Sequence, residues 1–189
     1  MAAIAERLTP RASQAVFRVL LDSLARPGQV LALPQPEPGP GIVPLALAVV
    51  GSPVAVLGDP AWERTVCRAT GALPAAPGDA SLVAIYGAAD AAAVIPRLRR
   101  GSALAPEDGA KAGLACRGLS ADGSGEVTLE LSGPGVPGQA RLGVDGLGRA
   151  VFDALREANA RFPAGIDVWL VDSRGQVAGL PRSARQVVV

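Results

Sequence analysis

The sequence predicts an α/β fold in which a mixed sheet and its flanking helices form three layers. Short apolar runs typical of buried strands alternate with longer segments of helical character through the first half of the chain. Glycine or a Pro-Gly pair ends the clearest helical segments. The chain has 189 residues, of which 49% are hydrophobic and 19% are charged, which is typical of one globular domain. We therefore expect one α/β domain over residues 1–189, with residues 1–12 as a flexible N-terminus.

The first half contains the two best-defined helices of the sequence. Apolar residues recur at helical spacing through residues 13–26, with Phe17, Leu20, Leu21 and Leu24 on one stripe, until Pro27-Gly28 stops the helix. The other helix begins after Asp59, an N-cap residue followed by Pro60, and Gly71 ends it. The remaining elements expected here are a strand at 29–33, a turn-rich linker at 34–41, a helix at 42–50, strands at 54–57 and 82–86, and a helix at 88–100.

The second half is organised differently. Two apolar segments, 112–119 and 127–131, flank a polar and glycine-rich stretch, which predicts a β-hairpin with a long loop. Asp145 is a suitable cap for a helix that reaches Ala160 with its apolar residues on one face. The last expected elements are strands at 166–171 and 177–180, joined by a turn. We expect all strands to belong to one mixed sheet.

The composition excludes several classes of catalyst. The chain has no histidine, so Ser-His-Asp and Cys-His catalysis and His-ligated zinc are absent. Lys111 is the only lysine, and a Schiff base with pyridoxal phosphate would have to form there. Cys67 and Cys116 lie far apart and without CxxC spacing, which favours two separate thiols over a disulfide or a metal pair.

Charge and hydropathy also exclude two kinds of partner. Basic and acidic residues number 18 and 17, and a net charge of +1 gives no electrostatic reason to bind nucleic acid. Prolines and glycines interrupt the apolar stretch at 42–58, so it falls short of the ~20 residues that cross a bilayer. The first ten residues include Glu6 and Arg7 and lack the apolar core of a secretory signal. We expect a cytoplasmic protein.

A glycine-rich motif follows one predicted strand. Residues 133–138 read GPGVPG and match G-x-G-x-x-G, and Asp153 stands at the distance of the acidic residue in a dinucleotide fingerprint. Such a loop binds pyrophosphate through consecutive backbone N–H groups at a helix N-terminus. The two prolines of the motif have no N–H, and no helical pattern follows directly. We favour a rigid, tightly turned loop, and a contact with an anion or a partner through Gly133 and Gly135 stays open.

Several charged residues are candidates for binding but not for catalysis. Arg182 follows a proline at a strand end, where a surface ion pair is favoured and an anion contact is the alternative. Asp167 lies in an apolar strand, so it either caps backbone N–H groups or has a functional partner. The arginines at 97, 99 and 100 lie at the end of a predicted helix, where their positive charges are expected to complement the helix C-terminus. Phosphate binding is the alternative. Glu107-Asp108 is typical of a solvated turn. We assign no catalytic residue, no cofactor and no metal.

Motifs along the chain, taken in order, resemble the H-subunit family of the bacterial carbon–phosphorus lyase system, which acts in phosphonate utilisation. They are Phe17-Arg18…Leu20-Leu21 leading to Arg26-Pro27-Gly28; Ala105-Pro106-Glu107 with Gly109-Ala110; Leu131–Val136; Phe162-Pro163 with Gly165-Ile166-Asp167; and Leu180-Pro181-Arg182. The resemblance runs from about Ser13 to the C-terminus and depends on the joint order and spacing of the motifs. Lys111 departs from the small polar residue expected after Gly109-Ala110.

The resemblance implies a homodimeric subunit whose fold is similar to the large domain of pyridoxal-phosphate-dependent transferases, without that cofactor. It also implies a complex with other carbon–phosphorus lyase subunits. That system replaces the adenine of ATP with an alkylphosphonate at the ribose C1′, and a radical subunit later cleaves the carbon–phosphorus bond. This chain lacks the clustered cysteines of an iron–sulfur radical enzyme. We therefore expect a supporting subunit, with ATP or phosphonate as a ligand at a shared site. The alternative is a stand-alone nucleotide- or anion-binding α/β enzyme.

Overall fold

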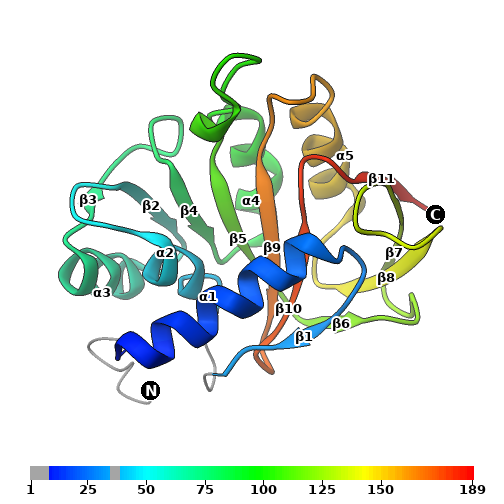
Figure 1. Ribbon diagram of the computed structural model, residues 1–189, viewed down its shortest axis with the longest axis horizontal. Coiled ribbons are helices and arrows are strands. Elements are labelled where there is room, and N and C mark those ends of the chain that lie inside the picture. The colour runs from blue at the N-terminus through cyan, green and yellow to red at the C-terminus, as the bar shows by residue number, and fades with distance from the viewer. Residues whose placement is uncertain (1–8, 35–38) are drawn as a thin grey trace.

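The computed structural model, which describes residues 9–34 and 39–189, contains two β-sheets (Figure 1). The larger sheet has seven strands in the order β1-β10-β9-β5-β4-β2-β3. Its strands are β1 (Leu31–Ala32), β10 (Gln176–Leu180), β9 (Asp167–Asp172), β5 (Lys111–Cys116), β4 (Leu82–Ile85), β2 (Pro53–Leu57) and β3 (Leu73–Pro74). The five strands from β9 to β3 run parallel, whereas β10 runs antiparallel to its two neighbours, β9 and β1. The mixed α/β class is therefore confirmed.

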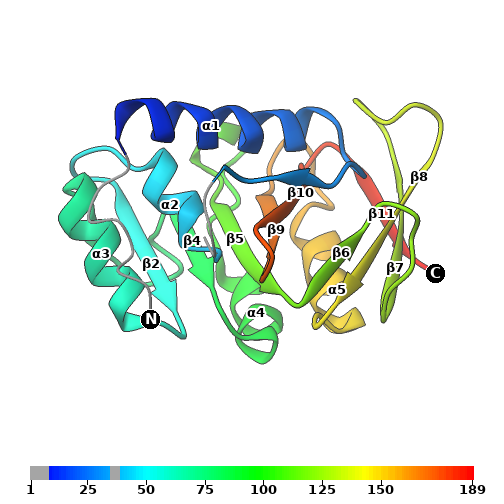
Figure 2. The same ribbon diagram turned by 90° about the horizontal axis from the view of Figure 1, so that it is seen from below.

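Helices cover both faces of the larger sheet, as Figure 2 shows. One face carries α1 (Pro10–Ala25), α2 (Ile42–Leu47) and α3 (Pro60–Thr70); the other carries α4 (Ala88–Val94) and α5 (Arg149–Ala158). Each side has its own buried core: Leu20 of α1 packs in one, and Phe152 of α5 packs in the other. Apolar side chains alternate between these cores along each strand, because successive side chains of a strand point to opposite faces. A likeness to the large domain of pyridoxal-phosphate transferases stays a prediction.

The smaller sheet has four antiparallel strands in the order β11-β7-β8-β6. Its strands are β11 (Arg185–Val188), β7 (Val127–Ser132), β8 (Ala140–Asp145) and β6 (Gly118–Ser120). Leu129 and Leu131 of β7 are fully buried in the core that also contains Phe152 of α5. The expectation of one mixed sheet is wrong, because these strands form a separate sheet behind which α5 packs.

The predicted hairpin between residues 112–119 and 127–131 is also wrong. Strand β5 lies in the centre of the larger sheet between β4 and β9, and β6 pairs with β8. The hairpin that does form joins β7 to β8. Apolar and polar residues alternate only weakly in residues 140–145, and Gly143 lies among them, so this strand is hard to detect from the sequence.

Helix boundaries depart from the sequence predictions at several points. Asp145 does not cap a helix: it ends β8 and accepts the Glu126 N–H at 2.9 Å, and α5 begins after Gly148. The helix predicted for 88–100 ends at Val94, and a 3₁₀ turn at Ile95–Arg97 follows, since Pro96 cannot donate to the helical ladder. The helix predicted for 42–50 ends at Leu47. In contrast, α3 agrees with its prediction, because Asp59 accepts two backbone N–H groups and Gly71 is left-handed.

Helix α1 begins before its predicted start. Thr9 caps it by accepting the Ala12 N–H at 3.2 Å, and Pro10 occupies its first position. The last part of the flexible segment expected at 1–12 is therefore helical, and residues 1–8 lie outside the described residues. No helix of the described chain is both long and apolar enough to span a membrane.

Candidate functional site

A largely buried ion pair between Arg182 and Asp167 forms the centre of the candidate site. The Arg182 Nη2 lies 2.7 Å from Oδ2 of Asp167, and its Nε lies 3.2 Å from both carboxylate oxygens. The backbone N–H of Arg182 also donates to Oδ1 of Asp167 at 2.9 Å. The two side chains are only 11% and 17% exposed. The surface ion pair expected for Arg182 is therefore a buried one, and Asp167 has both a backbone donor and a charged partner.

Arg182 also binds the loop that precedes β5. Its Nη1 donates to the carbonyl oxygen of Pro106, within the short 3₁₀ turn Pro106–Asp108. Gly109 follows this turn and lies directly against Gly165, so a Cβ at position 109 would overlap the Gly165 carbonyl oxygen. The N–H of Gly165 in turn donates to the Arg100 carbonyl at 2.7 Å. Three of the motif segments that carry the family resemblance therefore meet here.

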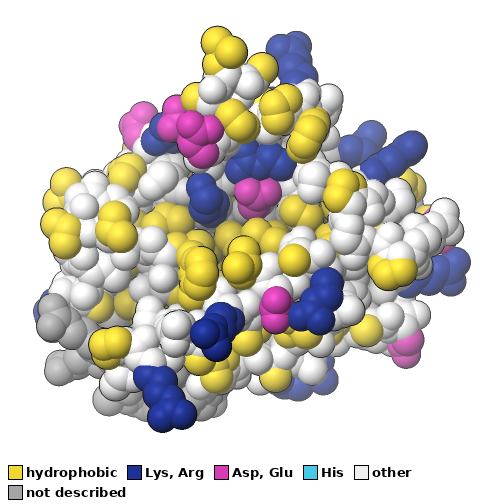
Figure 3. Space-filling model, in the orientation of Figure 1, with side chains coloured by type: hydrophobic (Ala, Val, Ile, Leu, Met, Phe, Trp, Pro, Cys, Tyr) yellow, Lys and Arg dark blue, Asp and Glu magenta, His cyan; other side chains and the backbone are white. Residues whose placement is uncertain are grey.

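Lys111 lies beside this ion pair. It is the register partner of Asp167 across β5 and β9, and its Nζ lies 3.3 Å from the carbonyl oxygen of Glu107. Both residues begin their strands, so the site lies at the amino ends of the parallel strands. Figure 3 shows acidic and basic side chains together in a hollow on this face, above α1. The amine of Lys111 thus holds a loop carbonyl in this structure.

The arginine cluster at residues 97–100 does not gather around one point. Arg99 contacts the Asp79 carbonyl at 3.4 Å and Asp108 at 3.8 Å. Arg100 donates to the Pro96 carbonyl at 3.2 Å, four residues earlier in its own chain segment. These contacts favour the structural interpretation, in which the cations neutralise nearby backbone carbonyls and one acidic residue.

The glycine motif forms the loop of the β7–β8 hairpin and no helix follows it. Val136 donates its N–H to the Gly133 carbonyl at 3.1 Å, which closes a turn inside the loop. Gly133 lies against the backbone of residues 183–185, and Gly135 lies against the end of α1 at Ala25 and Pro27. The tight turn predicted for this loop is confirmed, whereas its rigidity stays a prediction. The strand–loop–helix geometry of a dinucleotide site is absent at these residues.

The motif segments together form one continuous chain of contacts across the molecule. Residues 25–27 contact the Gly133–Val136 loop, which contacts residues 183–185. Arg182 continues the chain to Asp167 and to Pro106. Asn159 supports it from α5, since its side-chain amide donates to the Ile166 carbonyl at 3.1 Å and accepts the Ile166 N–H at 2.8 Å. The structure thus brings Gly133 and Arg182 into one region, in which residues 183–185 connect them.

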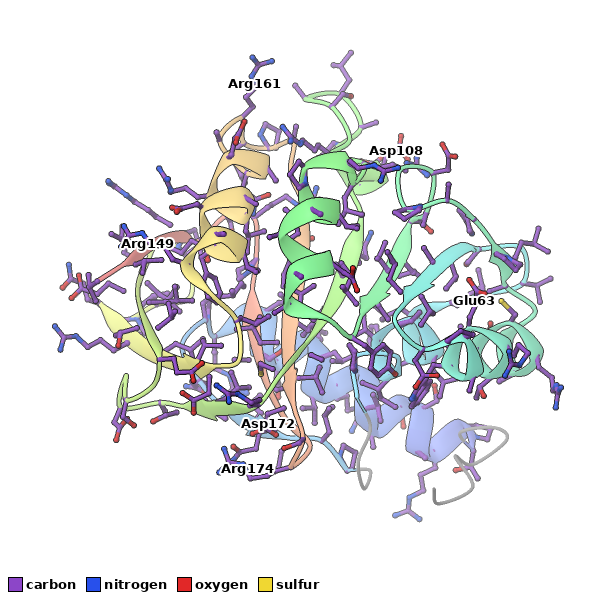
Figure 4. All side chains as sticks on the ribbon, turned by 180° about the vertical axis from the view of Figure 1, so that it is seen from behind. Glu63, Asp108, Arg149, Arg161, Asp172 and Arg174 are labelled. Carbon is purple, nitrogen blue, oxygen red and sulfur yellow. The ribbon has the colours of Figure 1, made fainter. Side chains whose placement is uncertain are left out.

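The carboxyl ends of the parallel strands, where α/β sheets most often bind ligands, lie at the opposite end of the sheet. A cavity of about 360 Å³ is lined there by Tyr86, Cys116 and Asp172 among others. Figure 4 shows Asp172 and Arg174 at this end, far from Asp108 and Arg161. The Asp172 carboxylate already has partners within the chain: it lies 3.0 Å from the Arg174 guanidinium and accepts the N–H of Gln176 at 2.8 Å.

The surroundings of the Cys116 thiol in this cavity disfavour its thiolate form. Burial, with a smaller contribution from the Asp172 carboxylate, raises the pKa of Cys116 from 9.0 to about 12. The reactive form of cysteine is the thiolate, which this shift suppresses. Within residues 9–34 and 39–189, no three His, Cys, Asp or Glu side chains are placed to hold a metal ion.

The raised pKa of Cys116 predicts a pH-dependent stability. Below pH 9.0 the thiol is protonated in both states, whereas between 9.0 and about 12 only the unfolded chain loses the proton. Ionisation then favours unfolding, so the free energy of unfolding falls as pH rises from 8 to 10, by roughly 1 kcal/mol. We therefore expect the free energy of unfolding of Cys116→Ala, measured with urea, to fall less between pH 8 and pH 10 than that of the unmodified chain, by about this amount. Equal losses in the two proteins would contradict the shift.

Comparison with known proteins supplies the family. The sequence model of the family described as bacterial phosphonate metabolism protein (PhnH) matches residues 7–187. A comparison with curated proteins finds no match. The matched range includes every motif segment that meets around Arg182 and Gly133. The sequence identifies those segments only singly, and Asn159, which belongs to no motif, was not predicted.

Proposed function

This chain belongs to the PhnH family of bacterial phosphonate metabolism proteins, and we propose from this that it is a non-radical subunit of the carbon–phosphorus lyase complex. With partner subunits it supports the transfer of alkylphosphonate to the ribose C1′ of ATP, with release of adenine. In these terms it is a subunit of the α-D-ribose 1-methylphosphonate 5-triphosphate synthase. The observation that carries the proposal is the family match over residues 7–187.

The geometry of the candidate site favours a supporting role over catalysis by this chain alone. Arg182 and Asp167 neutralise each other, and the amine of Lys111 lies on a backbone carbonyl. A general acid or base needs a free proton-accepting or proton-donating group within reach of its substrate. The side chains at this site instead bind the motif segments to one another. We propose that they give the subunit a fixed surface for its partners.

The partner and ligand assignments belong to the same proposal. The subunit is a cytoplasmic homodimer that joins other carbon–phosphorus lyase subunits. ATP or phosphonate binds at a site that this chain shares with a partner, beside Gly133, Gly135 and Arg182. The loop glycines leave backbone exposed for such a contact, and Arg182 belongs to the same contact chain, although Asp167 offsets its charge.

Co-expression with the other subunits of the complex tests the proposal directly. We expect the chain to elute with them from a sizing column in a fixed ratio, because the function requires a shared assembly. The chain expressed alone, at the same concentration, is the control and should elute at lower mass. A chain that remains alone when all subunits are present would contradict the proposal.

The alternative, a stand-alone nucleotide-binding enzyme, predicts a different result. Calorimetric titration of the isolated chain with ATP and with NAD would then give saturable heat. We expect no heat at millimolar ligand, because the glycine motif forms a hairpin loop that lacks a following helix. Saturable binding to the isolated chain would favour the alternative.

A further inference from the structure

A groove runs between helix α5 and the last strand of the chain, β11. It has a volume of about 560 Å³, and α5 contributes Arg149, Phe152 and Arg156 to its lining. The other wall is the segment from Arg182 to Val188, which includes the whole of β11. Figure 1 shows β11 next to α5 at the C-terminal end of the chain. A groove between a helix and an edge strand is a geometry that can accept an extended peptide as an added strand.

Strand β11 has an unpaired outer edge. It is the first strand in the order of the smaller sheet and pairs only with β7 among the described strands. The Val189 N–H donates to the Thr128 carbonyl at 3.0 Å. Because the hydrogen bonds of an antiparallel ladder involve alternate residues, the N–H and C=O groups of Gln186 and Val188 point away from β7. The edge therefore presents alternating donors and acceptors to the groove side.

Gln186 also offers an unused side-chain acceptor. It is 8% exposed, it lines the groove, and its Oε1 has no hydrogen-bond partner among the described residues. Buried polar atoms of this kind are nearly always paired in folded proteins. A donor from a bound segment, such as a backbone or side-chain N–H, would pair with this oxygen.

The groove carries an excess of positive charge. Among the described residues that line it, Asp153 is the single acidic one, and it lies 3.7 Å from Arg149 and 3.0 Å from Arg156. Those two arginines remain 66% and 65% exposed. Arg185 lines the same groove and is also exposed. Figure 4 shows Arg149 at the start of α5, on the side where β11 lies. The ligand should therefore be acidic.

We propose that this groove binds an extended, acidic segment of a partner subunit, which pairs with the outer edge of β11 as a further strand of the smaller sheet. The inference rests on the proposed membership of a complex. A second copy of this chain fits poorly, because pairing two β11 edges would bring the same arginines together. A phosphate ligand would use the guanidinium groups but would leave the carbonyl groups of the strand edge without donors.

Two pairs of variants separate the strand edge from the charge. Val188→Pro removes an outward N–H without removing a bond to β7, and Val188→Ala is its matched control, since it loses the side chain but keeps the N–H. Arg149→Glu with Arg156→Glu reverses the charge of the groove. Arg64→Glu with Arg68→Glu changes the net charge equally on the exposed side of α3.

Hydrogen–deuterium exchange of the co-expressed complex, read residue by residue, is the direct measurement. We expect the amides of Gln186 and Val188 to exchange at least tenfold more slowly in the complex than in the isolated chain. We expect Val188→Pro and the Arg149/Arg156 reversal to weaken assembly at least tenfold, and the two control variants to weaken it less than threefold. Unchanged exchange of those amides in an assembled complex would overturn the inference. If these amides of the isolated chain exchange more slowly as its concentration rises, the result would also overturn the inference, because it would show that the β11 edge pairs with a second copy of this chain.

A peptide probe keeps the inference testable if the proposed complex does not form. A seven-residue peptide of alternating Glu and Val, followed by fluorescence anisotropy, should bind the isolated chain at least tenfold more tightly than a Lys-Val peptide. Val188→Pro should abolish that binding, and Val188→Ala should retain it. Absence of peptide binding in that case would overturn the inference. ATP binding that the Arg149/Arg156 reversal abolishes and Val188→Pro preserves would instead assign the groove to a phosphate ligand.

Discussion

Replacing Arg182 with methionine should lower the free energy of unfolding by about 3 kcal/mol, because it leaves the Asp167 carboxylate in a largely buried position without its cation. The same change removes the donor to the Pro106 carbonyl. The segment before β5 then loses its connection to the C-terminal residues. Urea unfolding followed by circular dichroism measures the loss.

Two further variants show whether the pair itself is responsible. Asp167→Asn with Arg182→Met removes both charges, and the double variant should be less destabilised than the sum of the single ones by about 1–2 kcal/mol. Arg182→Lys keeps the charge but loses the planar fork that contacts both carboxylate oxygens, so an intermediate loss is expected. Additive losses, or a loss below 1 kcal/mol for Arg182→Met, would show that this contact is not a major source of stability.

The second large effect is expected at Gly135. Its φ is +80°, and a Cβ there would overlap the carbonyl oxygen of Ala25 at the end of α1. Because backbone rather than a flexible side chain occupies that space, the loop or α1 would have to move. We expect Gly135→Ala to lower the free energy of unfolding by about 3 kcal/mol or more, because the alanine would be strained in the left-handed conformation and its Cβ would overlap the Ala25 carbonyl oxygen.

Gly138 is a matched control in the same loop. It also has a positive φ, +73°, but a Cβ there would meet nothing within 4 Å. Gly138→Ala should therefore lower the free energy of unfolding by only about 1 kcal/mol, which is the strain of an alanine in the left-handed conformation. Urea unfolding of both variants gives the difference. Equal losses would mean that the contact between this loop and α1 contributes little.

Local signals predicted individual elements well wherever the deciding groups are close in sequence. Asp59, Pro60 and Gly71 set the ends of α3, because a cap acts on backbone groups within one helical turn. The strands predicted at 54–57, 82–86, 166–171 and 177–180 correspond to β2, β4, β9 and β10, with bounds close to those predicted. The predicted apolar stripe of α1 was only partly right, since Leu20 is buried whereas Phe17 and Leu21 are exposed.

The candidate site could be predicted in its parts but not in its arrangement. The segments around Pro106, Gly133, Asp167 and Arg182 were identified singly as motifs. Their contact chain depends on the order of strands in the larger sheet, which places the starts of β5 and β9 side by side. The groove beside β11 had no sequence signal, because neither Gln186 nor the unpaired edge forms part of a motif.

The sequence by itself determined the α/β class, the excluded chemistries, the turned loop at 133–138 and the motif order that identifies the family. These depend on residue types and on short spacings, which act locally along the chain. Only the tertiary structure decided that β5 joins the centre of the larger sheet, that a second sheet forms, and that Arg182 and Asp167 form a largely buried ion pair. Such pairings join residues far apart in sequence, and the packing of the whole chain selects among strand partners that look alike locally.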